Sequence, residues 1–341
     1  MNTDTIINVR KTNGRGTRIV VFGIFCYACA ILIRSFTCES TNLNYLINKN
    51  KKSNKKSNKK SSIIAITPTY HRLDDRNMQA HLLLTLRNTL CASNIPILWI
   101  LIESSKDFRR SALIEKYANE SRDLLCELLY VKALHVSMAE SSYHRGVEQR
   151  NAALDWIQNS KLNDGVILFI DDDNAYDVLH FQNAAKVKRI KVWPIGFPSS
   201  LSKFEAPVMS DKVIGFRSFW CGQPNHPPRL FAIDMCGFGI RLSSLGDARF
   251  DSRALPGYLE DLFLQNVTKN IINGSNPALT ATSEDLLNVL EFDASSDEIN
   301  VWHLYHKKQI GGQSSAEIIH RVPTGESFIC PKPKQSNSNS K

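Results

Sequence analysis

The 341-residue sequence predicts an α/β fold with a mainly parallel β-sheet. Between residues 63 and 170, short apolar runs alternate with segments of helical spacing, which is typical of parallel strands wound by helices. The apolar run at 166–170 ends in three consecutive acids, Asp171, Asp172 and Asp173. No GxGxxG or P-loop motif follows the strands, which argues against a dinucleotide oxidoreductase or a P-loop NTPase.

The expected elements follow from residue spacing. The apolar run at 63–67, stopped by Pro68, predicts the first strand, and a Leu-rich segment at 78–93 predicts the first helix. A strand over 97–102 and a helix over 108–129 come next, then a strand over 132–136. Val147, Leu154 and Ile157 have the spacing of a helix over 147–157, and 166–170 reads as a buried strand.

After Asp173 the pattern loosens. Residues 192–195 are a candidate strand, 224–228 a Pro-rich loop, and 232–240 a second apolar run that contains one acid, Asp234. Such an acid is usually paired or functional, because burying a bare charge is costly. Glu260 and Asp261 precede a helix-like segment. Two acids at this place are explained equally well by a favourable interaction with the helix dipole and by a functional role. His303 follows an apolar pair, where a packed or capping histidine is the simpler reading.

The carboxyl ends of the predicted strands define one candidate site. In open α/β sheets ligands bind at that edge, where residues 67–70, Glu103 with Ser104, and Asp171 to Asp173 are expected to meet. Clustered carboxylates suit a hard divalent cation that carries a phosphate-bearing substrate. A solvated acidic turn is the alternative.

The net charge of +9 belongs to one end of the chain. Residues 1–61 hold 12 of the 42 basic residues and 2 of the 33 acidic ones, so they carry +10 and the remainder −1. The remainder therefore has no global nucleic-acid signature, and we expect no nucleic-acid partner. The Lys-Lys-Ser-Asn repeats after residue 50 predict a disordered stem over 34–61.

An uncharged apolar stretch at 19–33 predicts a membrane anchor, although it is shorter than the roughly 20 residues typical of a span. A signal peptide is the alternative, because Ala28-Cys29-Ala30 resembles a cleavage site. Basic residues before the stretch favour a cytoplasmic tail at 1–18. Three glycosylation sequons, at Asn119, Asn266 and Asn273, favour a luminal remainder.

The eight cysteines predict no zinc site. No CxxC pair lies outside the apolar stretch, and Cys38, Cys91, Cys126, Cys221, Cys236 and Cys330 are widely scattered. Some of them could pair in an oxidising lumen, but the spacing does not give the connectivity. Buried thiols are an equally good reading.

Residues 64–306 carry a series of motifs that resembles one family. In order they are residues 66–70 (ITPTY), 145–151 (RGVEQRN) with 153–156 (ALDW), 171–174 (DDDN), 192–194 (VWP), 204–207 (FEAP), 234–238 (DMCGF), 257–260 (GYLE) and 301–303 (VWH). This series resembles the β-1,3-glucuronyltransferases of glycosyltransferase family 43, and among them the galactosylgalactosylxylosylprotein 3-β-glucuronosyltransferases of proteoglycan-linkage synthesis.

The resemblance implies a GT-A fold with a donor half followed by an acceptor half, over a luminal catalytic domain at 62–322 and a polar tail at 323–341. It implies a type II Golgi membrane protein, a homodimer, that uses Mn²⁺ to transfer glucuronic acid from UDP-glucuronic acid to the 3-hydroxyl of a terminal galactose. The roles that it implies are donor binding by Tyr70, Arg145, Arg150, Asp171, Asp172 and His303, metal binding by Asp173, acceptor binding by Glu205, Arg229 and Asp234, and general base catalysis by Glu260.

Two positions depart from the family pattern. Ser104 stands where the family has an Asp that recognises uracil, and Tyr305 stands where it has an Arg near the pyrophosphate. Losing a charge-assisted contact costs about 1.5–3 kcal/mol. The departures leave two alternatives open: a non-catalytic Golgi lectin, or the same mechanism with another UDP-sugar.

Overall fold

The computed structural model describes residues 62–70, 76–105, 110–119, 126–137, 146–197, 203–275, 280–292, 298–304 and 329–330. The predicted cytoplasmic tail, anchor and stem lie outside these residues, and so do Arg145 and Tyr305. No helix within the described ranges is long and apolar enough to cross a membrane.

The larger sheet begins with three parallel strands, β1 (Ile63–Tyr70), β2 (Ile97–Ser105) and β3 (Leu129–Ser137). On the other side of β1 lies parallel β4 (Val166–Phe169). Antiparallel β10 (Phe238–Arg241) separates β4 from β6 (Ile190–Val192), and β11 (Leu290–Glu291) ends the sheet. Across the described residues this sheet has seven strands in the order β11-β6-β10-β4-β1-β2-β3. The predicted α/β class with a mainly parallel sheet is therefore confirmed.

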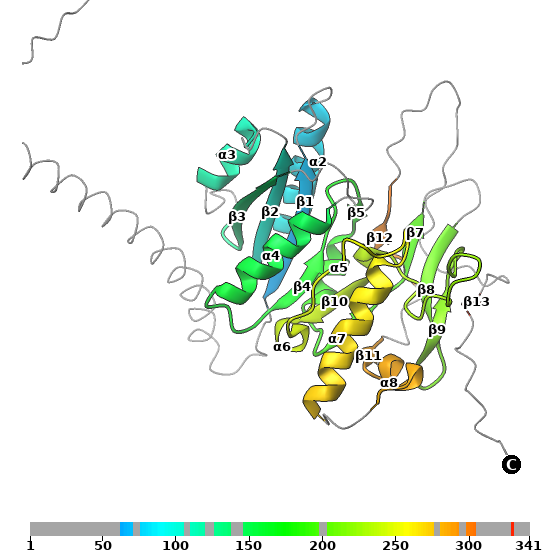
Figure 1. The fold of residues 1–341 in the computed structure, drawn as a ribbon. Coiled ribbons are helices and arrows are strands. Elements are labelled where there is room, and N and C mark those ends of the chain that lie inside the picture. Colours follow the sequence, from blue (N-terminus) through cyan, green and yellow to red (C-terminus); the bar gives the residue numbers. More distant parts are fainter. Residues whose placement is uncertain are drawn as a thin grey trace, which may run out of the picture. The chain divides into compact units, whose positions relative to one another are not determined.

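Helices connect these strands (Figure 1). They are α2 (Arg76–Ala92), α3 (Ala112–Asn119), α4 (Val147–Asn159), α5 (Val178–Ala184), α6 (Leu242–Leu245), α7 (Leu259–Ser275) and α8 (Ser283–Asn288). The face of α4 that carries Val147, Leu154 and Ile157 is buried, and α4 contacts β1, β2 and β3. The spacing of those three residues was the signal for this helix.

A second sheet is formed by six other strands, all of which follow the acids in the chain. Within the described ranges its order is β13-β9-β8-β7-β12-β5. Its strands are β5 (Ala175–Tyr176), β7 (Ile195–Phe197), β8 (Lys203–Met209), β9 (Val213–Arg217), β12 (Val301–Trp302) and β13 (Ile329–Cys330). Phe204, Ala206, Ile299 and Trp302 form a buried cluster on this sheet.

Aromatic side chains join β4 to α7. The ring of Phe169 meets those of Phe238, Phe250 and Phe263 edge-on at centroid distances of 5.9, 5.1 and 5.6 Å. Phe250 and Phe263 stack at 3.9 Å. Edge-to-face aromatic packing adds about 0.5–1.5 kcal/mol per pair beyond area burial. The start of α7, where Glu260 lies, is thus fixed relative to the strand that precedes the acids.

Several predicted boundaries were wrong. The first strand, expected to stop at Pro68, runs on to Tyr70, because residues 68–70 still pair with β2. The helix expected over 108–129 is described only at Ala112–Asn119, and Leu129 begins β3 because it pairs with Ile97 of β2. Residues 192–195 form no single strand: β6 ends before Trp193, and β7 starts after Pro194 in the other sheet. The domain limit at 322 was too early, because Ile329 and Cys330 pair with β9. Two residues are too few for periodicity to reveal a strand.

Asn151 offers a test of how α4 is attached. Its side chain donates to the backbone oxygen of Phe250 and accepts from the backbone N–H of Phe250, both at 2.9 Å. We expect Asn151→Ala to lower the free energy of unfolding by about 2 kcal/mol, because it leaves both backbone groups without their partner. Urea denaturation measures the change. Asn159→Ala is the matched control, since its side chain donates to the backbone oxygen of Asp155 in its own helix; equal losses in the two variants would contradict this account.

Candidate functional site

The strand ends meet at one edge of the larger sheet. Parallel register places Thr69 beside Glu103 and Tyr70 beside Ser104, while Ile66 lies beside Phe169. The N–H of Ile170 donates to the oxygen of Ile66 at 2.9 Å, so β4 ends, just before the acids, where β1 still has four residues to run. The edge predicted from the sequence is therefore formed.

Asp171 and Asp172 are held by neighbouring side chains. Asp171 pairs with the guanidinium of Arg150 at 2.5 Å, and Arg150 is buried on α4. Asp172 is buried and accepts a hydrogen bond from the hydroxyl of Thr69 at 2.8 Å. Both acids have the fixed orientation that contact with a polar ligand requires.

A buried amide extends this network across the sheet. Gln79 of α2 donates to the hydroxyl oxygen of Thr69 at 3.1 Å and to the carboxylate of Glu103 at 3.3 Å. Glu103 also accepts from the backbone N–H of Ser111 at 2.7 Å. Sequence reasoning missed Thr69 as an orienting residue and Gln79 altogether. A polar residue at a strand end was a usable signal for Thr69, but Gln79 lies in an ordinary helical pattern.

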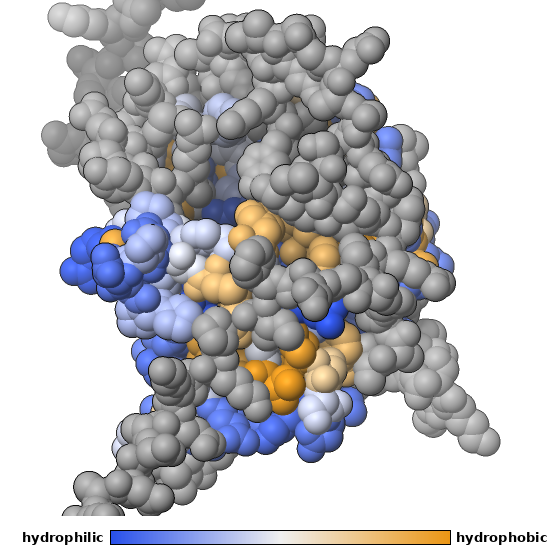
Figure 2. Space-filling view, turned by 90° about the vertical axis from the view of Figure 1, so that its right-hand side faces the viewer, coloured by the Kyte–Doolittle hydropathy of each residue, from blue (hydrophilic) through white to orange (hydrophobic). Residues whose placement is uncertain are grey.

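Ser104 is also engaged. It is 4% exposed, and its hydroxyl oxygen accepts a hydrogen bond from the buried amide of Gln149 at 2.7 Å. Its neighbour in the register, Tyr70, is 40% exposed. Figure 2 shows apolar surface, in orange, among hydrophilic surface on one face. Single exposed apolar side chains are common, so exposure alone assigns Tyr70 no role.

Asp173 has the surroundings that favour a cation. Burial, together with the negative charges of Asp171 and Asp172, raises its pKa to about 6. Among the described residues no other side chain hydrogen-bonds its carboxylate. A hard cation bound to this oxygen ligand would remove the repulsion that raises the pKa.

The donor set fits Mn²⁺ only if other ligands join it. No group of three or more His, Cys, Asp or Glu side chains that could hold a metal exists among the residues that the structure describes. Carboxylate oxygen suits Mn²⁺, and nucleotide sites often bind a metal through one or two carboxylates and the substrate phosphates. Asp173 fits that arrangement.

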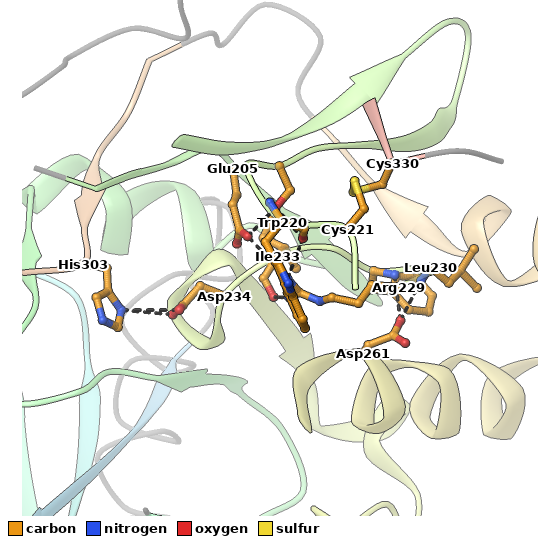
Figure 3. Close-up of polar contacts among 12 residues, drawn as sticks. Glu205, Trp220, Cys221, Arg229, Leu230, Ile233, Asp234, Asp261, His303 and Cys330 are labelled. Atoms are coloured by element: carbon orange, nitrogen blue, oxygen red, sulfur yellow. Dashed lines mark hydrogen bonds and ion pairs between the residues drawn. A yellow bond between two sulfur atoms is a disulfide. The ribbon is translucent and has the colours of Figure 1, made fainter. Parts of the chain in front are cut away.

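His303 links the strand edge to a second polar cluster. It follows β12, and its backbone N–H donates to Gly196 at 2.9 Å. Its Nδ1 lies 3.4 Å from both carboxylate oxygens of Asp234 (Figure 3). Burial alone would lower the pKa of His303, but the hydrogen bond and charge of Asp234, with Asp171 and Asp173, raise it to about 9. The imidazole is therefore cationic at neutral pH.

The second cluster is a buried ion pair. Arg229 lies 3.4 Å from Glu205 of β8, donates to the oxygen of Ile233 at 2.9 Å, and has its guanidinium 5.3 Å from the centre of the Trp220 ring. The hydroxyl of Ser218 donates to Glu205 at 2.6 Å. Burial raises the pKa of Glu205 to about 7, outweighing the opposing charge of Arg229.

Both members of this pair keep unused polar atoms. Within the described part of the chain, Oε2 of Glu205 and Nε of Arg229 are buried without a hydrogen-bond partner. Leaving such groups unsatisfied costs about 1–3 kcal/mol each. A hydroxyl-rich ligand would relieve that cost, since a hydroxyl both donates and accepts. Sequence reasoning did not identify Ser218 or Trp220. Ser218 bonds to Glu205, which is distant in the sequence, and Trp220 contacts Arg229 across a loop.

Glu260 and Asp261 differ in their surroundings. Asp261 is 2% exposed and accepts from the backbone N–H groups of Leu230 and Phe231, at 2.9 and 2.8 Å. It therefore fixes the chain that follows Arg229. Burial, with the charge of Asp234, raises the pKa of Glu260 to about 7. A carboxylate of this pKa can take up a proton near neutral pH.

The asparagines of the three sequons lie on helices. Asn119 is the last residue of α3, while Asn266 and Asn273 are exposed on α7. The hydroxyl of Thr268, in the second sequon, is buried and donates to Leu264 at 2.8 Å. Use of these sites stays a prediction.

Comparisons with known proteins agree with this arrangement. The glycosyltransferase family 43 profile matches residues 86–307. The human galactosylgalactosylxylosylprotein 3-beta-glucuronosyltransferase 3 is 34% identical over 227 residues, which cover 60% of this chain and 64% of that protein. The Caenorhabditis elegans galactosylgalactosylxylosylprotein 3-beta-glucuronosyltransferase sqv-8 is 33% identical over 215 residues, covering 60% and 57%. The chain thus spans less than two thirds of these relatives.

Among solved structures, the galactosyltransferase LgtC in complex with donor and acceptor sugar analogues aligns at 10% identity. The alignment covers 71% of this chain and 87% of that one with a TM-score of 0.33, a likeness too distant to carry an inference.

Asp234 should control the charge of His303. In Asp234→Asn the pKa of His303 should fall from about 9 toward its ordinary 6.5, because burial is then opposed only by the charges of Asp171 and Asp173. NMR titration of the ring in metal-free protein measures the pKa, with the exposed Asp211→Asn as control.

The same pair should affect stability with a defined sign. A raised histidine pKa stabilises the folded state fully below pH 6.5 and loses this effect as the pH rises through about 9. The stability deficit of Asp234→Asn should therefore shrink between pH 6 and pH 10. A pKa that stays near 9 in the variant would contradict the assignment.

Proposed function

The chain belongs to glycosyltransferase family 43, and we propose that it is an inverting, Mn²⁺-dependent glucuronyltransferase. It moves glucuronic acid from UDP-glucuronic acid to the 3-hydroxyl of a terminal galactose on a glycan. The observation that carries the proposal is the contact between Asp234 and His303. His303 is within electrostatic reach of Asp171 and Asp173, and Asp234 is within reach of the buried Glu205–Arg229 pair. The contact therefore lies between the two clusters, and a transferase needs its two substrate sites adjacent.

The donor is bound at the strand edge. Tyr70 stacks on the uracil ring, for which its exposed side chain is suited. Arg145 and Arg150 neutralise the negative charges of the phosphates and the sugar carboxylate. Asp171 and Asp172 accept hydrogen bonds from the sugars, and His303, cationic at neutral pH, contacts the diphosphate.

Asp173 is the protein ligand for Mn²⁺, because its carboxylate has a raised pKa and no other side-chain partner among the described residues. Held by Asp173, Mn²⁺ would supply positive charge to offset the negative charge that develops on the leaving group.

The acceptor galactose is bound by Glu205, Arg229 and Asp234. The buried, unpartnered oxygen of Glu205 and nitrogen of Arg229 match sugar hydroxyls. Glu260 takes the proton of the 3-hydroxyl as that oxygen attacks the anomeric carbon. Its raised pKa makes it a stronger base than an ordinary glutamate. One displacement converts the α-linked donor into a β-linked product.

The same proposal includes a Golgi location. The chain is a type II membrane protein anchored by residues 19–33, with a luminal catalytic domain that forms a homodimer. The disulfide between Cys221 and Cys330 supports a luminal site, because disulfides persist in oxidising compartments.

A donor panel tests the reaction. The protein, a β-galactoside and UDP-glucuronic acid should give transfer with Mn²⁺ and little with a chelator, and UDP-glucose and UDP-galactose should be poor donors.

Asp173→Asn should lower the rate at least ~10²-fold, since a catalytic metal contributes several kcal/mol of charge stabilisation. Asp211→Asn, exposed in the turn after β8, is the control. Equal rates without metal, a preference for another donor, or acceptor binding without transfer would each refute the proposal.

Glu260→Gln should separate binding from chemistry. We expect kcat to fall at least ~10²-fold, the scale for losing a general base, while calorimetry shows UDP binding within about twofold of the parent. The parent rate should rise with pH up to about 7, where Glu260 loses its proton, and the variant should lack this rise. Glu284→Gln on the exposed face of α8 is the control. Near-normal turnover in Glu260→Gln would remove this residue from its role.

A further inference from the structure

The disulfide joins two parts of the chain that are 109 residues apart. Cys330 lies in β13, where it pairs with Phe216 of β9. Cys221 follows Trp220 and begins the loop that leads to Arg229. The neighbouring strand of β9 is β8, which contains Glu205. The bond therefore ties the start of the Arg229 loop to the strands that hold the partner of Arg229.

Arg229 depends on Cys221 and Trp220 for its position. Its backbone N–H donates to the oxygen of Cys221 at 2.8 Å. Its guanidinium donates to the oxygen of Trp220 at 3.4 Å and lies over the Trp220 ring. Figure 3 shows the disulfide, Trp220 and Arg229 in this arrangement.

The loop between Cys221 and Arg229 has little structure of its own. Residues 224–228 are exposed, and within the loop His226 donates to Gln223 at 3.2 Å. A second attachment comes from Tyr258, whose hydroxyl accepts from the N–H of Gln223 at 3.0 Å and donates to the oxygen of Pro227 at 2.8 Å. Exposed segments with few internal contacts open locally at low cost, so attachment from outside decides the conformation.

The side-chain amide of Gln223 also donates to the oxygen of Pro256 at 3.2 Å. These attachments act on different parts of the loop. Tyr258 holds its middle, at Gln223 and Pro227, whereas the disulfide fixes Cys221, which Arg229 contacts directly. We propose that the Cys221–Cys330 disulfide is a positioning device for Arg229, and that it sets acceptor affinity while leaving donor binding and the chemical step unchanged. The acceptor part of this inference rests on the proposed function.

The test compares the parent with the Cys221→Ser/Cys330→Ser double variant. We expect the acceptor KM to rise about tenfold or more, because misplaced binding groups lose their oriented contacts. The kcat at saturating acceptor and the Kd of UDP should stay within about twofold of the parent. Cys91→Ser is the control, because Cys91 lies in α2 outside this disulfide.

Amide hydrogen exchange gives a readout that does not depend on activity. Peptides covering 222–231 should exchange faster in the double variant, while β1 and α4 keep the parent rates. If the double variant does not fold, exchange is compared in the parent before and after treatment with a phosphine. That reagent reduces the disulfide to two thiols and becomes a phosphine oxide, with its oxygen from water.

Each outcome decides the proposal. Faster exchange at 222–231 with a raised acceptor KM supports it. Unchanged exchange overturns it, and so does a parallel loss of UDP binding, which would make the disulfide a general stabiliser. If the parent transfers no glucuronic acid, the proposed function fails, but the exchange experiment still decides whether the disulfide positions the loop.

Discussion

The parallel pairing of β1 with β2 and β4 is the constraint on which the site depends. Because the three strands run in one direction, their carboxyl ends reach the same edge. Ile66 and Phe169 lie side by side, so the acids after β4 face the polar residues that complete β1. A shift of one residue in this register would exchange the faces of the strand and turn the hydroxyl of Thr69 away from Asp172.

Much of this framework was predictable from the sequence. Apolar β-branched runs identify β1, β2 and β4, and the spacing of Val147, Leu154 and Ile157 identifies α4. The local sequence pattern did not predict the secondary structure correctly where pairing with a distant strand determines it. Leu129 suits a helix or a strand, and its pairing with Ile97 makes it a strand.

The candidate site was predictable to a similar degree. Acids after a buried strand were recognisable in the sequence, as was the single acid in the run at 232–240. The sequence did not reveal that Glu260 and Asp261 differ in their surroundings. That distinction depends on the backbone N–H groups of Leu230 and Phe231, which donate to Asp261 and lie some thirty residues earlier. The hydrogen bond from Gln149 to Ser104 was likewise not predictable, because it forms only where α4 contacts β2.

The end of the folded region has a practical consequence for fragments of this protein. A recombinant piece cut at residue 322, where sequence pattern suggests a limit, would lack Cys330 and leave the thiol of Cys221 unpaired at the start of an exposed loop. Cys221 is half-buried, and an unpaired thiol that solvent reaches can be oxidised. Two such fragments would cross-link, and gel filtration would report a dimer that owes nothing to a native interface. Fragments meant for measuring oligomeric state should therefore retain residue 330.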